Sequence, residues 1–414
     1  MGSYQGDSRH LASPDSQVEL PLIVIGITNP QTCLVLTGRL RALREAGFHV
    51  VLLASPGPLL ELMAAQEGVE SLAIPMKRGI APLADLLSLF RLTKALFHLR
   101  PDIAEFSTPK AGLLGSLAAL VCRVPQRVYL LRGLRLETAS GLKRWILRDT
   151  ERLAAACCHI VLCNSESLRN QALALRLAGD SKLRLLGHGS SNGVDVERFT
   201  PGATGLKVQI GIPLRAPVIG FVGRLTRDKG VPELIQAFDV LLKTEPAARL
   251  LLVGWYDESE DALPLELRTS IDRHPQIVRT GFVADTAPYY RAMDMLVLPT
   301  YREGFPNAVL EAAASGIPVI TTLATGSRDA VVPEVTGLLI PPGCPEAITE
   351  AMLQLLGNAA RRRQMGVAAR KWVTERFLHT RVQATTVALY KDLLQLPSDR
   401  EFPAQARGAA LAGD

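Results

Sequence analysis

Two glutamates stand eight positions apart in the segment YREGFPNAVLEAAASGIPVITT, residues 301–322. Glu303 precedes a glycine, and Glu311 lies in a run of alanines that favours a helix. If that helix begins near Asn307, a good N-cap residue, its first amides have no partner within the helix and its start is electropositive. Such a helix start binds phosphate. The spacing predicts a diphosphate at the helix start, with sugar hydroxyls on Glu303 and ribose hydroxyls on Glu311.

Two cations are consistent with the same ligand. Arg224 and Lys229 lie five apart in FVGRLTRDKG, residues 221–230, directly after an apolar run. At the carboxyl end of a strand, such cations can clamp a diphosphate and neutralise a leaving group. Two simpler interpretations stay open. The cations can be solvated surface charges, and the glutamates can be ordinary acidic residues near a helix start, although Glu311 lies too deep to gain much from the dipole.

Strands must position these residues. Apolar runs alternate with helical segments along the chain, a pattern typical of parallel sheets covered by helices. The runs of the first series span 20–28, the end of 34–55 after Gly47, 69–76, 102–107, 127–133 and 159–165. Those of the second series span 218–223, 249–254, 277–283, 295–300, 318–322 and 337–342. The two series predict an α/β fold of two doubly wound Rossmann-like domains, facing each other across a cleft at the carboxyl ends of their strands.

Composition narrows the classes of function. The net charge of +6 fits an anionic membrane, phosphorylated substrates or nucleic acid, but aromatic residues make up only 5%, so we expect no nucleic-acid partner. The six cysteines show neither a CxxC pair nor zinc spacing, which favours reduced, mostly buried thiols in a cytoplasmic protein and no metal. No apolar run is long enough to span a membrane, and no secretory signal is recognisable. The sequence has neither GxGxxG after a first strand, the fingerprint of dinucleotide binding, nor GxxxxGK[ST], the P-loop, so any phosphate must be held by other segments.

The quoted segments resemble glycosyltransferase family 4, whose members have the two-Rossmann GT-B fold. EGFPNAVLEAAASGIPVI carries the E-x7-E motif of that family, and GRLTRDKG resembles its diphosphate loop. TGSRDAVVPEVTGLLIPPG, residues 325–343, resembles the segment that follows the motif, with Asp329 where glutamate is commoner. STPKAGLLGSLAA (107–119) and SSNGVDVERF (190–199) resemble a bacterial branch that acts on lipid-linked sugars.

The resemblance implies an enzyme that transfers a sugar from a nucleotide donor with retention of configuration, without a metal or other cofactor. UDP-hexose or UDP-N-acetylhexosamine is the expected donor, with GDP as the alternative nucleotide. Catalytic roles are implied for Arg224, Lys229, Glu303 and Arg132; donor contacts for Gly223, Gly304, Phe305, Pro306, Asn307, Glu311, Gly281 and Phe282; and acceptor-side positions for Thr37, Gly38 and Lys110.

One residue departs from the family pattern. After the strand that includes residues 127–131, relatives often have a His-Gly pair whose histidine faces the donor sugar, whereas this chain has Arg132-Gly133. A guanidinium is always charged, so Arg132 cannot act as a general base, although it can bind phosphate. His188 is an alternative, but we expect it to be structural because it lies off any clear strand end.

The expected domains follow from these assignments. They are a disordered arm (1–19), an acceptor-binding domain (20–195), a linker (196–216), a nucleotide-sugar-binding domain (217–375), a helix that crosses back to the first domain (376–396) and a disordered tail (397–414). The expected acceptor is a glycan on a polyprenyl diphosphate, in polysaccharide or glycoconjugate biosynthesis. A GT-B sugar-nucleotide epimerase and a non-catalytic nucleotide-sugar sensor remain alternatives, although a sensor would not need Arg224, Lys229 and Glu303 together.

The segment LKRWILRDTERLAAA, residues 142–156, is basic and amphipathic and includes Trp145. Further cations are expected around the loops of the first domain, namely Lys77, Arg78, Lys110 and Arg132. Together they predict peripheral contact with the inner face of the cytoplasmic membrane, because such a surface attracts anionic lipid. An ordinary surface helix with solvated arginines is the alternative.

Overall fold

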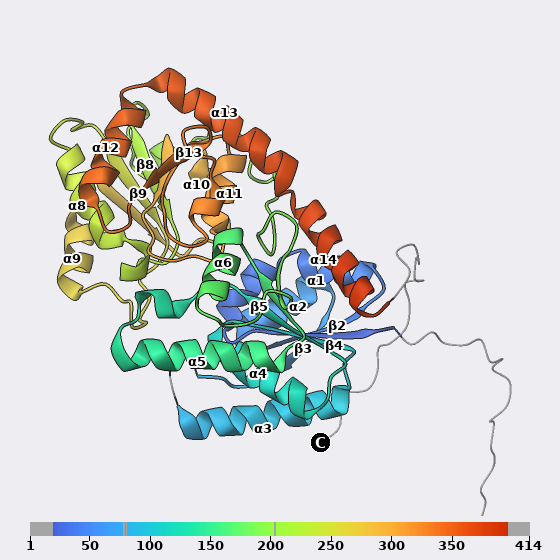
Figure 1. Cartoon of the computed structure of the whole chain (residues 1–414). Helices are drawn as coiled ribbons and strands as arrows, with labels where there is room; N and C mark the ends of the chain where they lie inside the picture. The colour runs from blue at the N-terminus through green and yellow to red at the C-terminus, as the bar shows by residue number, and fades with distance from the viewer. Residues whose placement is uncertain (1–19, 78, 80, 203, 396–414) are drawn as a thin grey trace, which may run out of the picture.

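The computed structural model describes residues 20–77, 79, 81–202 and 204–395, so the expected arm (1–19), the expected tail (397–414) and Arg78 lie outside the described residues. Within them, the chain forms two parallel β-sheets with helices packed on both faces (Figure 1). This confirms the predicted fold of two doubly wound Rossmann-like domains.

The first sheet has the strand order β3-β2-β1-β4-β5-β6-β7. Its strands are β1 (Leu22–Gly26), β2 (His49–Ala54), β3 (Glu70–Ala73), β4 (Ile103–Ser107), β5 (Gln126–Leu131), β6 (Ile160–Cys163) and β7 (Leu183–Leu185). Its helices are η1 (Pro30–Leu36), α1 (Arg39–Glu45), α2 (Pro58–Glu67), α3 (Pro82–Leu99), α4 (Pro109–Val121), η2 (Arg135–Thr138), α5 (Gly141–Cys157) and α6 (Glu166–Ala174). The central strands are buried along their length, because helices cover both sheet faces. Strand β7 was not predicted, since three residues show no measurable periodicity.

The second sheet has the order β10-β9-β8-β11-β12-β13. Its strands are β8 (Val218–Val222), β9 (Arg249–Val253), β10 (Ile277–Gly281), β11 (Met295–Leu298), β12 (Val319–Thr322) and β13 (Gly337–Ile340). Its helices are η3 (Arg227–Lys229), α8 (Val231–Leu241), α9 (Leu265–Arg273), α10 (Ala287–Tyr290), α11 (Asn307–Ala314), η4 (Arg328–Ala330), α12 (Pro345–Leu356) and α13 (Ala359–Arg376). A short helix, α7 (Leu206–Gln209), lies in the connection between the sheets.

The direction of strand order reverses between β1 and β4 in the first sheet, and between β8 and β11 in the second. Ligands of doubly wound folds bind at such reversals, outside the carboxyl ends of the strands. The loop after β8 carries Arg224 and Lys229, and the loop after β11 carries Glu303. The sheet order therefore brings together the residues that the sequence singled out.

The last helix, α14 (His379–Leu393), returns to the first domain and packs against α1, as Figure 1 shows at the red end of the chain. It is separated from α13 at Phe377, whose carbonyl accepts a hydrogen bond from the Val194 backbone (2.8 Å). Tyr390 of α14 is fully buried, and its hydroxyl lies 3.0 Å from the Arg39 guanidinium, which in turn pairs with Glu105 of β4 at 2.5 Å. This buried polar cluster fixes α14 to the first sheet.

All six cysteines are free thiols, and four of them are buried, as predicted. Within the described chain, no helix combines the length and the apolar character needed to cross a bilayer. No group of three or more His, Cys, Asp or Glu side chains is placed to hold a metal ion in that part of the chain.

Candidate active site

Lys229 and Glu303 form an ion pair at the centre of the candidate site. The Lys229 ammonium donates a hydrogen bond to Glu303 Oε1 across 74 positions of sequence, because β8 and β11 are neighbours in the sheet. The two side chains are only 15% and 16% exposed. An ammonium and a carboxylate so placed can contact adjoining parts of one ligand, an anionic group and a hydroxyl.

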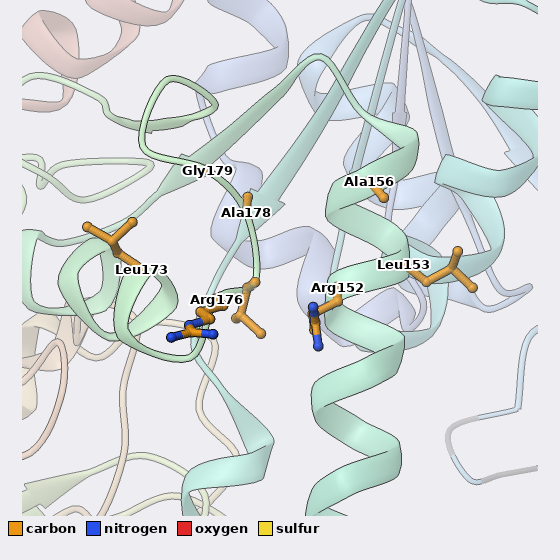
Figure 2. Close-up of a pocket in the computed structure, with 8 residues that line it drawn as sticks. Arg152, Leu153, Ala156, Leu173, Arg176, Ala178 and Gly179 are labelled. Carbon is orange, nitrogen blue, oxygen red and sulfur yellow. The ribbon is translucent and has the colours of Figure 1, made fainter.

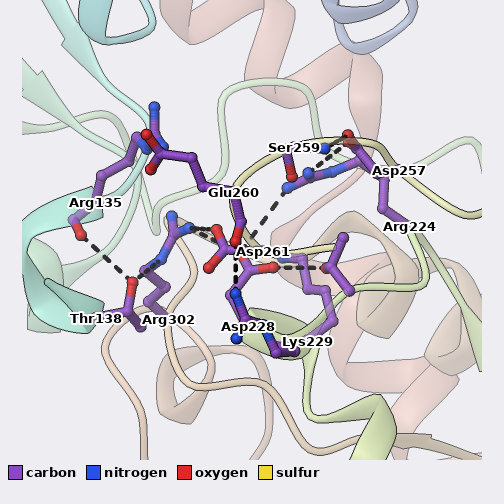
Figure 3. Close-up of polar contacts among 12 residues, drawn as sticks. Arg135, Thr138, Arg224, Asp228, Lys229, Asp257, Ser259, Glu260, Asp261 and Arg302 are labelled. Carbon is purple, nitrogen blue, oxygen red and sulfur yellow. Dashed lines mark hydrogen bonds and ion pairs between the residues drawn. The ribbon is translucent and has the colours of Figure 1, made fainter. Parts of the chain in front are cut away.

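Arg224 is held by carboxylates on two loops (Figure 3). Its Nη1 donates to Asp257 Oδ2 at 2.8 Å, and its Nη2 lies 3.9 Å from Asp228 Oδ2. Asp228 is buried and also pairs with Arg302 at 2.8 Å and accepts from the Thr226 hydroxyl at 2.6 Å. Cations and carboxylates therefore alternate around the loop after β8, which orders the guanidinium groups before any ligand arrives.

The charges of this network support one another. Burial alone would lower the pKa of Arg224, but the hydrogen bond that it donates to Asp257 and the charge of Asp228 raise it overall. Burial alone would raise the pKa of Asp228, but Lys229 and Arg302 lower it overall. Both groups are thus charged at neutral pH despite their burial.

Sequence reasoning missed three members of this network, Asp228, Asp257 and Arg302. Asp228 lies between Arg224 and Lys229, and two partly buried cations need a counter-charge, so its position was a usable signal. Asp257 follows β9, whose carboxyl end borders the same crevice.

Helix α11 begins at Asn307, with Pro306 as its N-cap. The prediction that Asn307 is the N-cap is therefore wrong: Pro306 takes the extended backbone conformation of a cap, and Asn307 is already helical. No side chain caps this helix. Among the described residues, no side chain accepts a hydrogen bond from its first amides, which are therefore suited to bind an anion.

Glu311 lies one turn into α11, and only one of its carboxylate oxygens is engaged. Its Oε2 accepts from the Tyr290 hydroxyl at 2.7 Å and from the Thr286 hydroxyl at 3.4 Å. Within the described residues, Oε1 has no hydrogen-bond donor. Burial raises the pKa of Glu311, although the hydrogen bond from Tyr290 and the charge of Arg198 oppose the shift.

The loop of Glu303 is enclosed by glycines of both domains. A Cβ on Gly304 would stand 2.3 Å from the carbonyl oxygen of Arg132, and a Cβ on Gly133 would stand 3.2 Å from the amide of Gly304. On the other side, a Cβ on Gly326 would stand 2.6 Å from the carbonyl oxygen of Glu303. The end of β5 and the loop after β12 thus contact the backbone of the candidate donor loop directly.

The Arg132 side chain makes its hydrogen bonds with two serines of the first domain. Its Nε donates to the Ser107 hydroxyl at 3.2 Å, and its Nη1 donates to the Ser191 hydroxyl at 2.9 Å. Its Nη2 is buried without a partner in the described chain. Burial and the charge of Arg39 lower the pKa of Arg132 to about 10.

Hydrogen bonds cross between the domains around the site. Asp329 accepts from the backbone amide of Ser167 at 3.2 Å and from its hydroxyl. The Thr325 hydroxyl donates to Glu137 at 2.6 Å. Arg302 donates to the Thr138 hydroxyl at 2.8 Å (Figure 3). The two domains are therefore in contact on several sides of the Glu303 loop.

The other predicted donor residues lie at the ends of strands of the second sheet. Gly223 follows β8, and Gly281 ends β10 with φ +73°. The exposed Phe282 ring meets Trp255 edge-on, with centroids 5.5 Å apart. Trp255 was not predicted, and it lines an interdomain hollow of about 280 Å³ together with Asn29, Gln31, Tyr256, Asp257 and Glu258. Phe305 is buried and packs on Phe377 at 5.1 Å.

The expected acceptor-side residues are spread over the first domain. Thr37 is exposed, and the Gly38 amide donates to Glu67 at 2.9 Å at the start of α1. Lys110 lies 2.6 Å from Asp85 and is mostly buried. The expectation that Lys110 and Arg132 add free surface charge around the loops of the first domain is therefore wrong, because each is engaged by side chains of that domain. His188 packs against Phe377, with ring centroids 6.4 Å apart.

A larger hollow, of about 630 Å³, lies away from these residues, between α5 and the turn that joins α6 to β7 (Figure 2). It contains none of the predicted site residues. Its lining consists of Arg152, Leu153, Ala156, Leu173, Arg176, Leu177, Ala178 and Gly179.

Comparisons with known proteins agree with this geometry. Residues 216–358 match the family model described as glycosyl transferases group 1, and residues 36–189 match the glycosyl transferase 4-like domain. The capsular polysaccharide biosynthesis glycosyltransferase CapM of Staphylococcus aureus is 34% identical over 89% of this chain and 96% of its own length. The UDP-Gal:alpha-D-GlcNAc-diphosphoundecaprenol alpha-1,3-galactosyltransferase of Escherichia coli is 26% identical over 72% of this chain and 77% of its own length.

The fold has solved counterparts. A crystal structure of HepE from Anabaena with UDP and glucose superposes with a TM-score of 0.73, at 18% identity, and covers 90% of this chain and 100% of that one. With the family matches, the paired cations and carboxylates and the two facing sheets, the conclusion is that this chain belongs to the group 1, GT4-like glycosyltransferases of the GT-B fold and is a sugar-transferring enzyme.

Proposed function

We propose that this enzyme transfers a hexose or N-acetylhexosamine from a UDP-sugar, with retention of configuration, to a hydroxyl of a glycan carried on polyprenyl diphosphate. The observation that carries the proposal is the Lys229–Glu303 pair beside the uncapped start of α11. The activities named for two relatives support it, because one of them acts in capsule biosynthesis and another acts on a diphosphoundecaprenol-linked sugar. HepE, which shares the fold, was crystallised with UDP and glucose.

Each part of a UDP-sugar has a matching group in the site. Arg224, Lys229 and the first amides of α11 bind the diphosphate, since cations and helix amides compensate its charge. Glu303 accepts hydrogen bonds from hydroxyls of the donor sugar. The unengaged Oε1 of Glu311 accepts from the ribose hydroxyls.

The same groups supply the chemistry. The bond between the anomeric carbon and the diphosphate oxygen breaks, and negative charge grows on the departing UDP. Arg224, Lys229 and the helix amides stabilise that charge. The acceptor oxygen bonds to the anomeric carbon on the face that UDP leaves, and its proton passes to the departing phosphate oxygen. Arg132 takes no proton, because its guanidinium remains charged at the pH of the reaction. The reaction therefore depends on positioning and electrostatics.

The test is an incubation of the purified protein with UDP-glucose, UDP-galactose, UDP-N-acetylglucosamine and UDP-N-acetylgalactosamine. Each donor is tested with and without a short-chain polyprenyl-diphosphate N-acetylglucosamine, and products are analysed by mass spectrometry and by NMR of the new anomeric centre. We expect acceptor-dependent release of UDP and an axial or equatorial linkage that matches the donor. An isomerised donor sugar without acceptor would identify an epimerase, and binding without turnover would identify a sensor; either result would overturn the proposal.

A further inference from the structure

Helix α3 exposes a row of large apolar side chains on the first domain. Leu83 is 87% exposed and Phe90 is 66% exposed, and Leu86, Leu87 and Phe97 are exposed on the same helix. Spacings of three, four and seven residues place these side chains on one face of a helix. The opposite face, which includes Leu92 and Leu96, is buried against the domain. The apolar row therefore serves no purpose in the packing of the described chain.

Charges on this helix are mostly basic. Arg91 and Lys94 are exposed among the apolar side chains. Asp85, the one carboxylate in the sequence of α3, is paired with Lys110 at 2.6 Å. An exposed apolar row with basic residues and no free acid is the pattern of a helix that lies in a membrane interface.

The surface continues beyond α3. Helix α3 packs on α4, and α4 packs on α5, so the three helices form one layer along the lower side of the first domain in Figure 1. Helix α5 exposes Leu142, Trp145 and Ile146, with Arg144 and Arg152 exposed on the same helix. We call the exposed side chains of α3 and α5 the α3–α5 face.

The hollow beside α5 adds a site for one anionic group. Arg152 and Arg176 enter it from its two sides, one on α5 and one on the turn after α6 (Figure 2). Arg152 has only a distant acidic neighbour, Asp149 at 3.9 Å. The rest of the lining is apolar, with Leu153 and Leu173 among it. Two guanidinium groups beside apolar walls suit the phosphate and upper acyl chain of a lipid.

We propose that the α3–α5 face docks on an anionic membrane surface, with the apolar row of α3 in the interface and a lipid phosphate between Arg152 and Arg176. Two copies of this chain joined through the same face would bring like charges together, which disfavours a second copy as the occupant. The inference extends the proposed function, because an acceptor with a lipid tail lies at a membrane. Helix α5 contacts η2, whose Thr138 bonds to the candidate active site, so docking through this face brings that site near the membrane.

The test measures co-flotation with vesicles of phosphatidylcholine, with and without phosphatidylglycerol. We expect the wild-type protein to bind the anionic vesicles, and the Phe90→Ser/Phe97→Ser variant to bind at least about tenfold more weakly at any salt concentration. The matched control is Leu265→Ser/Val367→Ser, which removes two apolar side chains that are equally exposed on the second domain. The control should bind like the wild type.

A second variant separates the charges from the apolar row. Arg152→Glu/Arg176→Glu should weaken binding about tenfold at low salt, and the difference should shrink as salt screens the phosphates. Wild-type-like binding by both double variants, or no binding of the wild type to anionic vesicles, would overturn the inference. The inference would also be overturned if the wild type sedimented as a dimer and did not bind vesicles, and if Phe90→Ser/Phe97→Ser made it monomeric. That result would assign the face to a second copy of the chain.

The proposed function is measured separately. Transfer to a water-soluble, short-chain acceptor should be unchanged by Phe90→Ser/Phe97→Ser, because these side chains lie outside the active site. If the variant loses membrane binding but transfers sugar normally, the α3–α5 face acts in docking and not in the reaction. If the protein binds vesicles but transfers no sugar, the proposed reaction is refuted and the docking inference still stands.

Discussion

Gly304 and Arg132, which belong to different domains, approach each other so closely that a Cβ on Gly304 would stand 2.3 Å from the Arg132 carbonyl oxygen. Real Cβ atoms do not come this near to backbone. The contact joins the loop after β11 to the end of β5, and Asp329 and Ser167 add a second interdomain contact nearby. The loop that carries Glu303 and Gly304 is therefore shaped by the first domain as well as by the second.

The first prediction concerns this contact. Gly304→Ala should lower turnover about a hundredfold, because a shift of about 1 Å between reacting groups has that effect. Binding of UDP should change less, since Lys229, Arg224 and Glu311 all belong to the second domain. Steady-state kinetics and calorimetric titration with UDP measure the two quantities. Gly205→Ala is the control, because nothing lies within 4 Å of the added carbon there. Wild-type turnover in Gly304→Ala would contradict the close contact.

The second prediction concerns charge on the leaving group. Lys229→Ala should lower kcat by two to three orders of magnitude, since one such contact contributes about 3–4 kcal/mol to the transition state. The measurement is the initial rate of acceptor-dependent UDP release. Lys243→Ala removes an exposed lysine of the same domain and should keep the wild-type rate. A normal rate in Lys229→Ala would remove Lys229 from the mechanism.

The third prediction concerns the pH dependence of donor binding. Burial raises the pKa of Glu311, and only the ionised carboxylate accepts from both ribose hydroxyls. The affinity for the donor should therefore be highest above the pKa of Glu311 and should fall as the pH drops through it. The fall should occur at a higher pH than for a glutamate with an ordinary pKa. Glu311→Gln should bind the donor more weakly at neutral pH and lack this dependence. Titration with an intact UDP-sugar measures both. The same pH profile in Glu311→Gln would exclude Glu311 as its origin.

The fourth prediction concerns stability. Burial raises the pKa of Glu151 from 4.5 to about 7, although the hydrogen bond from Tyr129 at 2.5 Å opposes the shift. Between these pH values the folded state holds a proton that the unfolded state has lost, so the free energy of unfolding falls as the pH rises. The decrease reaches about 3 kcal/mol near pH 7 and then levels off.

Urea unfolding of Glu151→Gln measures this effect by difference. The wild type should lose stability relative to the variant as the pH rises from 4.5 to 7. Glu350→Gln, which alters an exposed glutamate of α12, should follow the wild type. Parallel pH curves for Glu151→Gln and the wild type would show that the buried carboxyl has no such shift.

Several parts of the site could be predicted because they depend on short stretches of sequence. Arg224 and Lys229 share one loop, and Glu303 and Glu311 flank one helix start, so their spacing alone indicated a common ligand. Trp255 and Asp257 could have been predicted as site residues in the same way, since they follow the end of β9 as Arg224 follows the end of β8. The cap of α11 was misplaced by one residue because Asn is a preferred cap residue, whereas here the extended backbone of Pro306 sets the start of the helix.

Other features depend on residues far apart in the chain. Lys110 was expected on the surface, but Asp85 engages it from the preceding helix. Arg132 was expected among the catalytic residues, and its guanidinium is held by the hydroxyls of Ser107 and Ser191, which lie far from it in the sequence. The residue types predicted the charge of these side chains but not their orientation. The packing between β4, β5 and the interdomain connection decides that orientation.

By itself, the sequence determined the two βα series, the glycine and proline positions of the donor loop and the types of the groups that can bind a diphosphate. These follow from local periodicity and backbone freedom, which each short segment carries within itself. Only the tertiary structure decided that Lys229 pairs with Glu303, that Gly304 touches Arg132 and that no described part of the chain covers the apolar face of α3. Those relationships require a strand order and a domain packing, and each arises from contacts between segments that no local pattern encodes.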